Sequence, residues 1–161
     1  NNPETVGVED HVSLAIWAAD CAEHVLPFFE SDFPDDDRPR EAIEACRRWA
    51  DSRVFCMSEV RGSSLSAHAA ARGAPPGSAA QFAARAAGQA AATPHVPTHA
   101  LGPAWYGAKL ADVAGLEGER RWQFERLPIH LRPYVLAIAR KKRGLATVLQ
   151  YPGMVWQQQN D

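Results

Sequence analysis

The 161-residue chain lacks the sequence motifs that mark the common enzyme classes. It has no glycine-rich phosphate loop, no GxSxG nucleophile elbow, no HExxH zinc motif and no CxxC pair. It also has no alternating strand pattern of any length and no internal repeat. The sequence therefore gives no support to a nucleotide-binding protein, a serine hydrolase, a zinc protease or a β-sheet protein.

Cysteines and long apolar stretches are also few. The three cysteines, Cys21, Cys46 and Cys56, have no paired spacing, although a thiol nucleophile remains an alternative. Each apolar stretch is interrupted by Asp, His, Pro or Gly before it reaches about 18 residues, so we expect no membrane span. The first residues, NNPETVGVED, do not resemble a secretory signal. We therefore expect a reduced protein of the cytoplasm without a disulfide framework.

Alanine, in contrast, is abundant, with 29 copies in the chain. Residues 67–92 alone contain 14 of them, which gives this segment a strong helix propensity and very small side chains. The overall composition, with 46% hydrophobic and 22% charged residues, is that of an ordinary globular protein. We therefore predict an all-α fold, a compact bundle of five to seven helices joined by short loops rich in proline and glycine.

Capping residues and helix breakers divide the chain into segments. Pro39 suits the first turn of a helix that Asp36 or Asp37 can cap. The breaker segment 73–77 ends another helix, and Ser78 can cap the next one. The expected helices cover residues 11–31, the segment from Pro39, residues 58–72, residues 79–92, the segment around Trp105, residues 117–126 and residues 129–140.

We expect these helices to form one domain over residues 11–143. Residues 1–10 would be a flexible lead-in, and residues 144–161 a C-terminal tail. Part of the tail should pack against the domain, because it is apolar at five positions. These positions are Leu145, Val148, Leu149, Val155 and Trp156.

Charge is distributed unevenly, although the formal net charge is only −2. Residues 1–60 contain 14 acidic and 5 basic side chains, whereas residues 117–143 contain 8 basic and 3 acidic ones. Such asymmetry could dock one half of the chain on the other or attract a partner to either pole, and a solvated surface is the simpler interpretation. The basic run 140–143 is short and lacks interleaved aromatic residues, so we expect no nucleic-acid partner.

One apolar helix carries an unusual polar group. Residues 14–29 are apolar around nearly the whole circumference of the predicted helix, and their main polar residues are Asp20, Glu23 and His24. A spacing of three and four places these residues on one side of the helix. A helix of this kind is normally buried, and a buried carboxylate is costly without a partner. Some other side chain must therefore face Asp20 and His24.

Three segments offer possible partners for this polar group. Arg38 and Arg40, in the run DDDRPR, could form bidentate pairs with its carboxylates. His68 has alanines as immediate neighbours, so a narrow pocket could open around it. His95 and His99 form a histidine pair four residues apart.

The histidines could in principle hold a metal ion. His68, His95 and His99 are the candidate ligands, because histidines four apart are a known zinc geometry on a helix. Pro94 and Pro97 disfavour a regular helix at this pair. We therefore favour no metal site and expect no cofactor.

Two interpretations without a metal remain open. In an acid–base pocket, Asp20, His24 and His68 would be the catalytic residues, because a buried carboxylate beside a histidine can tune the pKa of both groups. Alternatively, the polar residues form a buried network that orients the helices, which is the simpler interpretation of each of them. The candidate substrate-binding residues are Arg38, Arg40, His99, Trp105 and Tyr106.

Five segments of the chain carry a family resemblance. They are WAADCAEHVLPFFE (17–30), PDDDRPREAIEACRRWA (34–50), LSAHAAAR (65–72), AARAAGQAAATPHVPTHALGPAWY (83–106) and ERRWQFERLPIHLRP (119–133). In this order they resemble the bacterial immunity proteins of the Imm-5-like family. Some members of that family carry the label of an SbcC-type exonuclease, for which this sequence has neither an ATP-binding loop nor a clustered acidic metal site.

The resemblance implies a compact helical protein of a bacterial toxin system that neutralises a toxin by binding it. One hypothesis is therefore a binding protein that sequesters a protein partner such as a toxin through its acidic N-terminal half. The alternative is a small helical enzyme, such as a lyase, cyclase or isomerase, that acts on a small apolar or aromatic substrate. A concave pocket lined by Asp20, His24, His68 and His99 would favour the enzyme, and mutually paired side chains would favour the binding protein.

Overall fold

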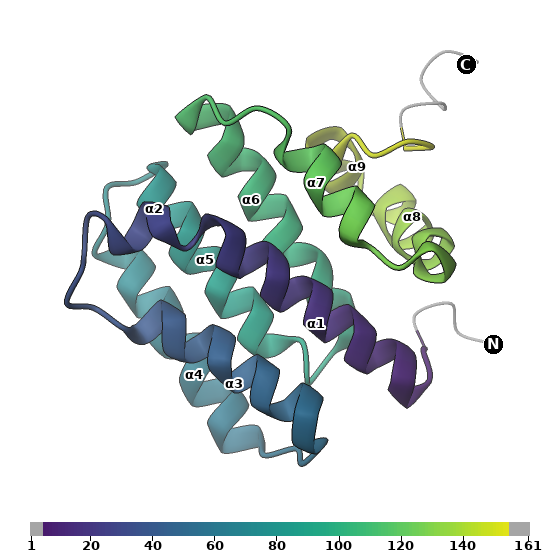
Figure 1. The fold of residues 1–161 in the computed structure, drawn as a ribbon, viewed down its shortest axis with the longest axis horizontal. Helices are drawn as coiled ribbons and strands as arrows, with labels where there is room; N and C mark the ends of the chain where they lie inside the picture. The colour runs from purple at the N-terminus through teal and green to yellow at the C-terminus, as the bar shows by residue number, and fades with distance from the viewer. Residues whose placement is uncertain (1–4, 155–161) are drawn as a thin grey trace.

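Helices account for all the regular secondary structure in residues 5–154, the part of the chain that this computed structural model describes (Figure 1). The predicted all-α class is confirmed. The elements in chain order are α1 (Val8–Val25), α2 (Pro27–Glu30), α3 (Arg38–Ser52), α4 (Met57–Arg72), α5 (Ala79–Ala92), the 3₁₀ turn η1 (Pro97–Ala100), α6 (Leu101–Ala114), α7 (Glu119–Arg126), the 3₁₀ turn η2 (Ile129–Leu131), α8 (Arg132–Lys141) and α9 (Arg143–Leu149).

Several helix ends follow the capping chemistry of the sequence. Ser78 caps α5, because its hydroxyl accepts a hydrogen bond from the backbone N–H of Gln81 at 3.2 Å. The first predicted helix is broken, since α1 ends at Val25 and Pro27 begins the short helix α2. At the start of α3, Asp37 occupies the N-cap position without a side-chain cap bond. The Asp36 carboxylate instead accepts from the backbone N–H of Arg38 at 3.2 Å.

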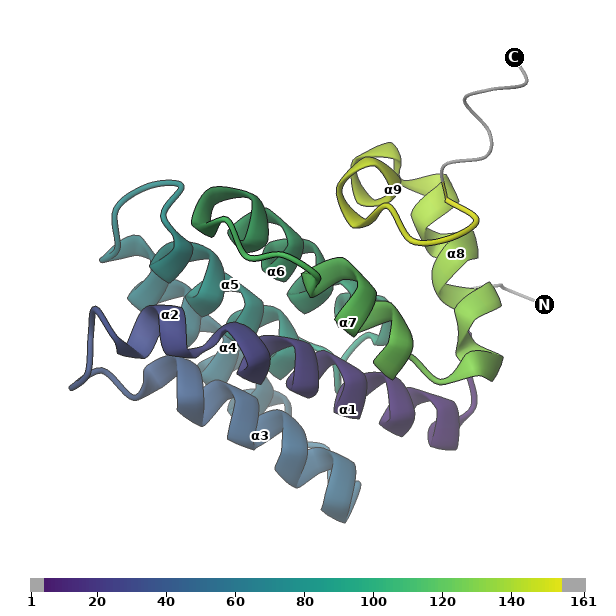
Figure 2. The same ribbon diagram turned by 45° about the horizontal axis from the view of Figure 1, so that its top comes forward.

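Helix α5 lies at the centre of the fold and contacts α1, α3, α4 and α6. Figures 1 and 2 show α3 and α4 on one side of α1 and α5, and α6 and α7 on the opposite side. Helices α8 and α9 pack against each other, and α9 contacts α6. Helix α1 contacts α3 on one side and α6 on the other.

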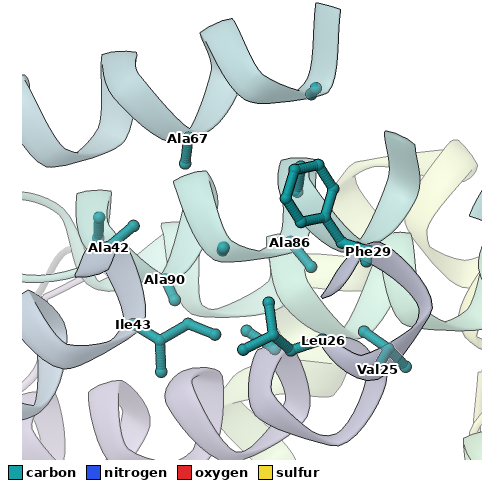
Figure 3. Packing of buried hydrophobic residues seen from close by; sticks show 14 of the residues in the cluster. Val25, Leu26, Phe29, Ala42, Ile43, Ala67, Ala86 and Ala90 are labelled. Atoms are coloured by element: carbon teal, nitrogen blue, oxygen red, sulfur yellow. The ribbon is translucent and has the colours of Figure 1, made fainter. Parts of the chain in front are cut away.

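The first of two apolar cores surrounds α5. The buried surface of α5 is nearly all alanine and glycine, so the neighbouring helices approach closely. Larger side chains such as Leu26, Phe29 and Ile43 fill the space between the helices (Figure 3). One close approach is at Gly88, where an added Cβ atom would lie 2.6 Å from Nε2 of His68. The sequence places glycine where α4 and α5 leave no room for a methyl group.

The second core joins the other side of α1 to the end of the chain. Trp17 and Cys21 of α1 pack there with Leu131, Ile138 and Tyr151. Leu149 is fully buried and Met154 nearly so, whereas Val155 and Trp156 of the expected tail lie outside the described residues. Helix α1 also begins at Val8, inside the segment expected to be a lead-in.

Burial of α1 between these two cores explains its apolar composition. Residues 8–30 form a helical stretch of 23 residues with a mean hydropathy of 1.2, which is long and apolar enough to cross a membrane. In the structure, 61% of an 18-residue part of this stretch is buried inside the protein. Core helices of soluble proteins share this length and composition, so the stretch is weak evidence for a membrane span.

Candidate functional site

Helices α1 and α2 are joined to α3 by ion pairs. Because the chain turns back between them, the residue numbers rise along α1 as they fall along the facing side of α3. Arg53 pairs with Glu9 near one end, and Arg40 pairs with Glu30 at the other, with the latter guanidinium 2.6 and 2.8 Å from the two carboxylate oxygens. Arg47 lies between these pairs and faces the polar group of α1.

Asp20 and Glu23 share one guanidinium. Nη2 of Arg47 donates to Oδ1 of Asp20 at 2.9 Å and to the carboxylate of Glu23. On its other side, Oδ2 of Asp20 lies 3.8 Å from Nη1 of Arg126 at the end of α7. The side chain of Asp20 is 28% exposed, so it lies at the edge of the core and not inside it. The expectation that this carboxylate meets a cationic partner is met, but the partner is Arg47.

The predicted pairing of Arg38 and Arg40 with the polar group of α1 is therefore corrected. The guanidinium of Arg38 donates to Asp36 at 2.7 and 2.9 Å, and Arg40 is bound to Glu30. The reason is geometric: Arg38 and Arg40 lie in the first turn of α3, where the antiparallel arrangement brings them to the end of α2 and not to the middle of α1.

His24 is held from α7 by two contacts. Its ring stacks on Trp122 with a centroid distance of 3.6 Å and an angle of 6° between the planes. Its Nδ1 lies 2.7 Å from Oε2 of Glu119, so the ring N–H donates to that carboxylate. The guanidinium of Arg126 lies over the ring of Trp122, 4.6 Å from its centroid.

Glu119 is the least expected member of this group, because its side chain is only 1% exposed. Its second carboxylate oxygen accepts from Nε2 of Gln123 at 3.2 Å, and that amide also donates to the carbonyl oxygen of Ala104 at 3.1 Å. The carbonyl end of Gln123 accepts from the hydroxyl of Tyr151 at 2.5 Å. A hydrogen-bonded chain therefore runs from the tail through α7 to His24 on α1, and we call these four side chains the His24 network.

Two buried groups in or beside the His24 network have raised pKa values. Burial raises the pKa of the Cys21 thiol well above its usual range, and the nearby carboxylates of Glu119 and Asp20 raise it further. Burial likewise raises the pKa of the Tyr151 hydroxyl. These groups therefore stay protonated at neutral pH, which suits hydrogen bonding and not nucleophilic attack.

A shallow hollow of about 210 Å³ opens to solvent over the network. Its lining residues are Asp20, Glu23, His24, Trp122 and Arg126. Each has a bonded or stacked partner within the protein, so the hollow has a charged floor whose groups are largely matched to one another.

His68 lies in a different cluster, between α4 and α5. Nη1 of Arg85 lies 2.8 Å from Nδ1 of His68, and a guanidinium can only donate, so this ring nitrogen carries no proton. Burial lowers the pKa of His68 to about 4, with the positive charges of Arg85 and Arg72 acting in the same direction. His68 is therefore a neutral packing residue at pH 7.

The remaining predicted site residues lie outside the His24 network and bond or stack with other neighbours. Nδ1 of His99 lies 3.0 Å from Oε1 of Gln89, and His95 stacks on Phe55 with a centroid distance of 6.2 Å. The indole of Trp105 donates to the carbonyl oxygen of Gly144 at 3.1 Å, and its ring meets Tyr106 edge-on at 4.9 Å. The structure thus places Asp20 and His24 in one cluster, and His68 and His99 outside it. Among residues 5–154, no group of three His, Cys, Asp or Glu side chains converges as metal ligands would.

The residues that sequence reasoning did not connect to the site are Arg47, Glu119 and Arg126. A signal for the last two is present in α7, where Glu119, Trp122, Gln123 and Arg126 follow a spacing of three, four and seven and so share one face. This helix has no apolar stripe of normal width, so its polar face is the one that packs.

A family model described as Imm-5 like putative immunity protein matches residues 4–130. The chain belongs to this family. The matched segment includes α1 to α7 and therefore three members of the His24 network, whereas α8, α9 and Tyr151 lie beyond it. No curated protein and no solved structure matches the chain.

Proposed function

We propose that this Imm-5-like protein is an immunity protein that binds a protein toxin and thereby neutralises it. The observation that carries the proposal is the family match over residues 4–130, which covers most of the helical bundle. The chemistry of the fold supports a binding role, because the charged groups of the hollow over His24 are matched to one another within the protein.

The distribution of charge favours recognition by the acidic part of the chain. Exposed carboxylates are concentrated from Asp32 to Asp51, in the α2–α3 loop and on the outer side of α3. A toxin with a basic surface would be attracted to this side and oriented by it, since complementary charge raises association rates. The three free thiols Cys21, Cys46 and Cys56 support a place in the reducing cytoplasm, where an intracellular toxin would act.

Co-expression tests the proposal directly. The toxin encoded beside the gene of this chain is expressed in a bacterial host from an inducible promoter, alone and together with the chain. We expect growth to be restored by the chain and the two proteins to elute together on gel filtration. Persistent toxicity at matched expression levels, with separate elution of the two proteins, would contradict the proposal.

A further inference from the structure

Exposed apolar side chains are concentrated in the segment between α3 and α4. Val54 is 73% exposed, Phe55 45% and Met57 38%, so three large apolar side chains within four residues face solvent. Other exposed apolar residues in the described part of the chain, such as Val113 and Ile129, are spread over separate helices. A concentration of this kind on a surface marks an interaction site more often than isolated residues do.

The apolar segment is held in a defined conformation. Arg53 ends α3 in the left-handed region with a φ of 59°, which is uncommon for a residue other than glycine, and its N–H donates to the carbonyl oxygen of Trp49 at 2.7 Å. Its guanidinium is paired with Glu9 of α1. The backbone N–H of Val54 donates to Oγ of Ser52 at 3.2 Å. These contacts hold Val54 outward on a fixed loop.

A groove continues from this segment between α3 and α4. One hollow of about 370 Å³ is lined by residues that include Trp49, Val54 and Val60. A second hollow of about 400 Å³ lies further along the two helices, beside Glu41 and Gly62, and both hollows share Glu59. We call the two hollows together the α3–α4 groove.

The charge of the α3–α4 groove is negative. Four carboxylates and two guanidinium groups line it. Both guanidinium groups are already occupied, since Arg38 is bound to Asp36 and Arg48 to Glu59. The remaining carboxylates form no hydrogen bond or ion pair with the residues that the structure describes, and they are available to a partner. They belong to Asp37, Glu41 and Asp51.

We infer that the α3–α4 groove binds a basic segment of the partner protein that also carries an apolar side chain. The apolar side chain enters the hollow beside Val54, and lysine or arginine side chains of the partner pair with the free carboxylates. This inference rests on the proposed function and adds the location of the binding surface and the chemistry of the partner.

The groove suits such a partner better than the hollow over His24 does. At the His24 hollow each carboxylate already has a cationic partner, so a ligand would have to displace an internal bond. At the α3–α4 groove, free carboxylates and exposed apolar side chains occur together, so a partner gains affinity by burying the apolar side chains and by pairing its basic groups with the carboxylates. The free carboxylates would repel nucleic acid or an acidic protein.

A matched pair of double variants tests the inference. The groove variant Val54→Ser/Asp51→Asn removes one exposed apolar side chain and one exposed carboxylate from the groove. The control Val113→Ser/Glu117→Gln removes the same kinds of group from α6 and the segment after it, and α6 packs against α5 and α1. Binding to the purified neighbouring toxin is measured by titration calorimetry, with circular dichroism to show that both variants are folded.

We expect the groove variant to weaken toxin binding at least about tenfold and the control to change it less than about twofold. Added salt should weaken binding of the unmodified chain more than binding of the groove variant. Bound toxin should also slow alkylation of Cys56, which lines the groove. Equal binding by the two variants, together with unprotected Cys56, would overturn the groove while leaving the proposed function in place.

Two other outcomes would also overturn the inference. If the unmodified chain does not bind the toxin at all, the proposed function fails and the inference fails with it. If sedimentation shows a dimer that the groove variant abolishes, while toxin affinity is unchanged, the groove binds a second copy of this chain and not the toxin.

Discussion

The three cysteines differ in their environment, and this difference determines their reactivity. Cys56 is exposed at the start of α4, and its Sγ lies 3.2 Å from Oγ of Ser58. Hydrogen bonding by Ser58 lowers the pKa of the Cys56 thiol below its usual value. Burial raises the pKa of Cys46 to about 12 and also raises that of Cys21. Among the three cysteines, only Cys56 is therefore both accessible and readily ionised.

We predict that iodoacetamide at neutral pH modifies Cys56 rapidly in the native protein and the other two thiols only after unfolding. Mass spectrometry of tryptic peptides measures the rate at each position. Ser58→Ala should slow the reaction of Cys56, because loss of the hydrogen bond returns its pKa toward the usual value. Modification of Cys21 at a comparable rate in the native state would contradict the burial described for α1.

The contact between His24 and Glu119 should contribute to the stability of the fold. Glu119 is buried, and His24 is the cationic or hydrogen-bonding partner at one of its carboxylate oxygens. We expect His24→Ala to lower the free energy of unfolding by about 1–3 kcal/mol, because it leaves that oxygen without a protein donor. Chemical denaturation at neutral pH measures the change.

A double-mutant cycle separates this hydrogen bond from the stacking of His24 on Trp122. In a Glu119→Gln background the carboxylate is absent, whereas the stacking is retained. The cost of His24→Ala should therefore be smaller there by about 1 kcal/mol. An unchanged cost would mean that packing, and not the carboxylate, accounts for the effect.

At the scale of helices, the packing of α4 on α5 depends on the absence of a side chain at Gly88. An added Cβ atom would meet three ring atoms of His68 at 2.6–2.9 Å. We predict that Gly88→Ala lowers the free energy of unfolding by about 1–3 kcal/mol despite the better helix propensity of alanine. Thermal unfolding followed by circular dichroism measures the loss.

Gly62 of α4 provides the matched control for this prediction. It is also inside a helix, and an added Cβ atom meets no described atom within 4 Å. Gly62→Ala should therefore raise stability by up to about 1 kcal/mol. Combining Gly88→Ala with His68→Ala should recover part of the stability that Gly88→Ala loses, because the clash with the ring of His68 is removed. Equal effects of the two glycine substitutions would contradict the close approach of α4 and α5.

Helix boundaries could be predicted where local chemistry decides them. Ser78 and the breaker segment 73–77 place the ends of α4 and α5 within one residue of the expected positions. The packed face of α7 could not be predicted in this way, because it is polar and contains Glu119. A hydrophobic pattern cannot reveal a face that is buried through hydrogen bonds to another helix.

For the molecule as a whole, His68 links stability to pH. Its pKa is lowered from the usual 6.5 to about 4 in the folded state, so between these values the unfolded chain binds a proton that the folded protein does not. Stability is therefore full above the ordinary pKa and falls as the pH decreases through this window. Allowing for partial exposure of the ring, we expect a loss of about 1 kcal/mol between pH 7.5 and about pH 5.

His68→Gln removes the titrating group and should reduce this acid sensitivity, whatever its effect at neutral pH. His130→Gln is a suitable control, because His130 is exposed and lies far from the α4–α5 contact in sequence. Denaturation at the two pH values measures the difference for each variant. If His68→Gln loses as much stability on acidification as the unmodified protein, the neutral state of His68 in the folded protein is contradicted.

The partners of the ionic side chains depend on how the helices are arranged in the whole fold. The expectation that Asp20 meets an arginine followed from the cost of burying a carboxylate. The choice of Arg47 over Arg38 and Arg40 depends on the antiparallel order of α1 and α3, which places the middle of one helix beside the middle of the other. Local spacing carries no such information, so the sequence alone cannot choose among the arginines of this helix.

The hydrogen bond from Tyr151 to Gln123 bears on which fragment of this chain can be expressed as a folded protein. The segment recognised as Imm-5-like ends at residue 130, but the second core needs Ile138, Leu149 and Tyr151 to cover Trp17. A fragment trimmed to the recognised segment would expose one side of α1 and leave Gln123 without its phenolic donor. In this chain the packed apolar core therefore extends past the matched segment.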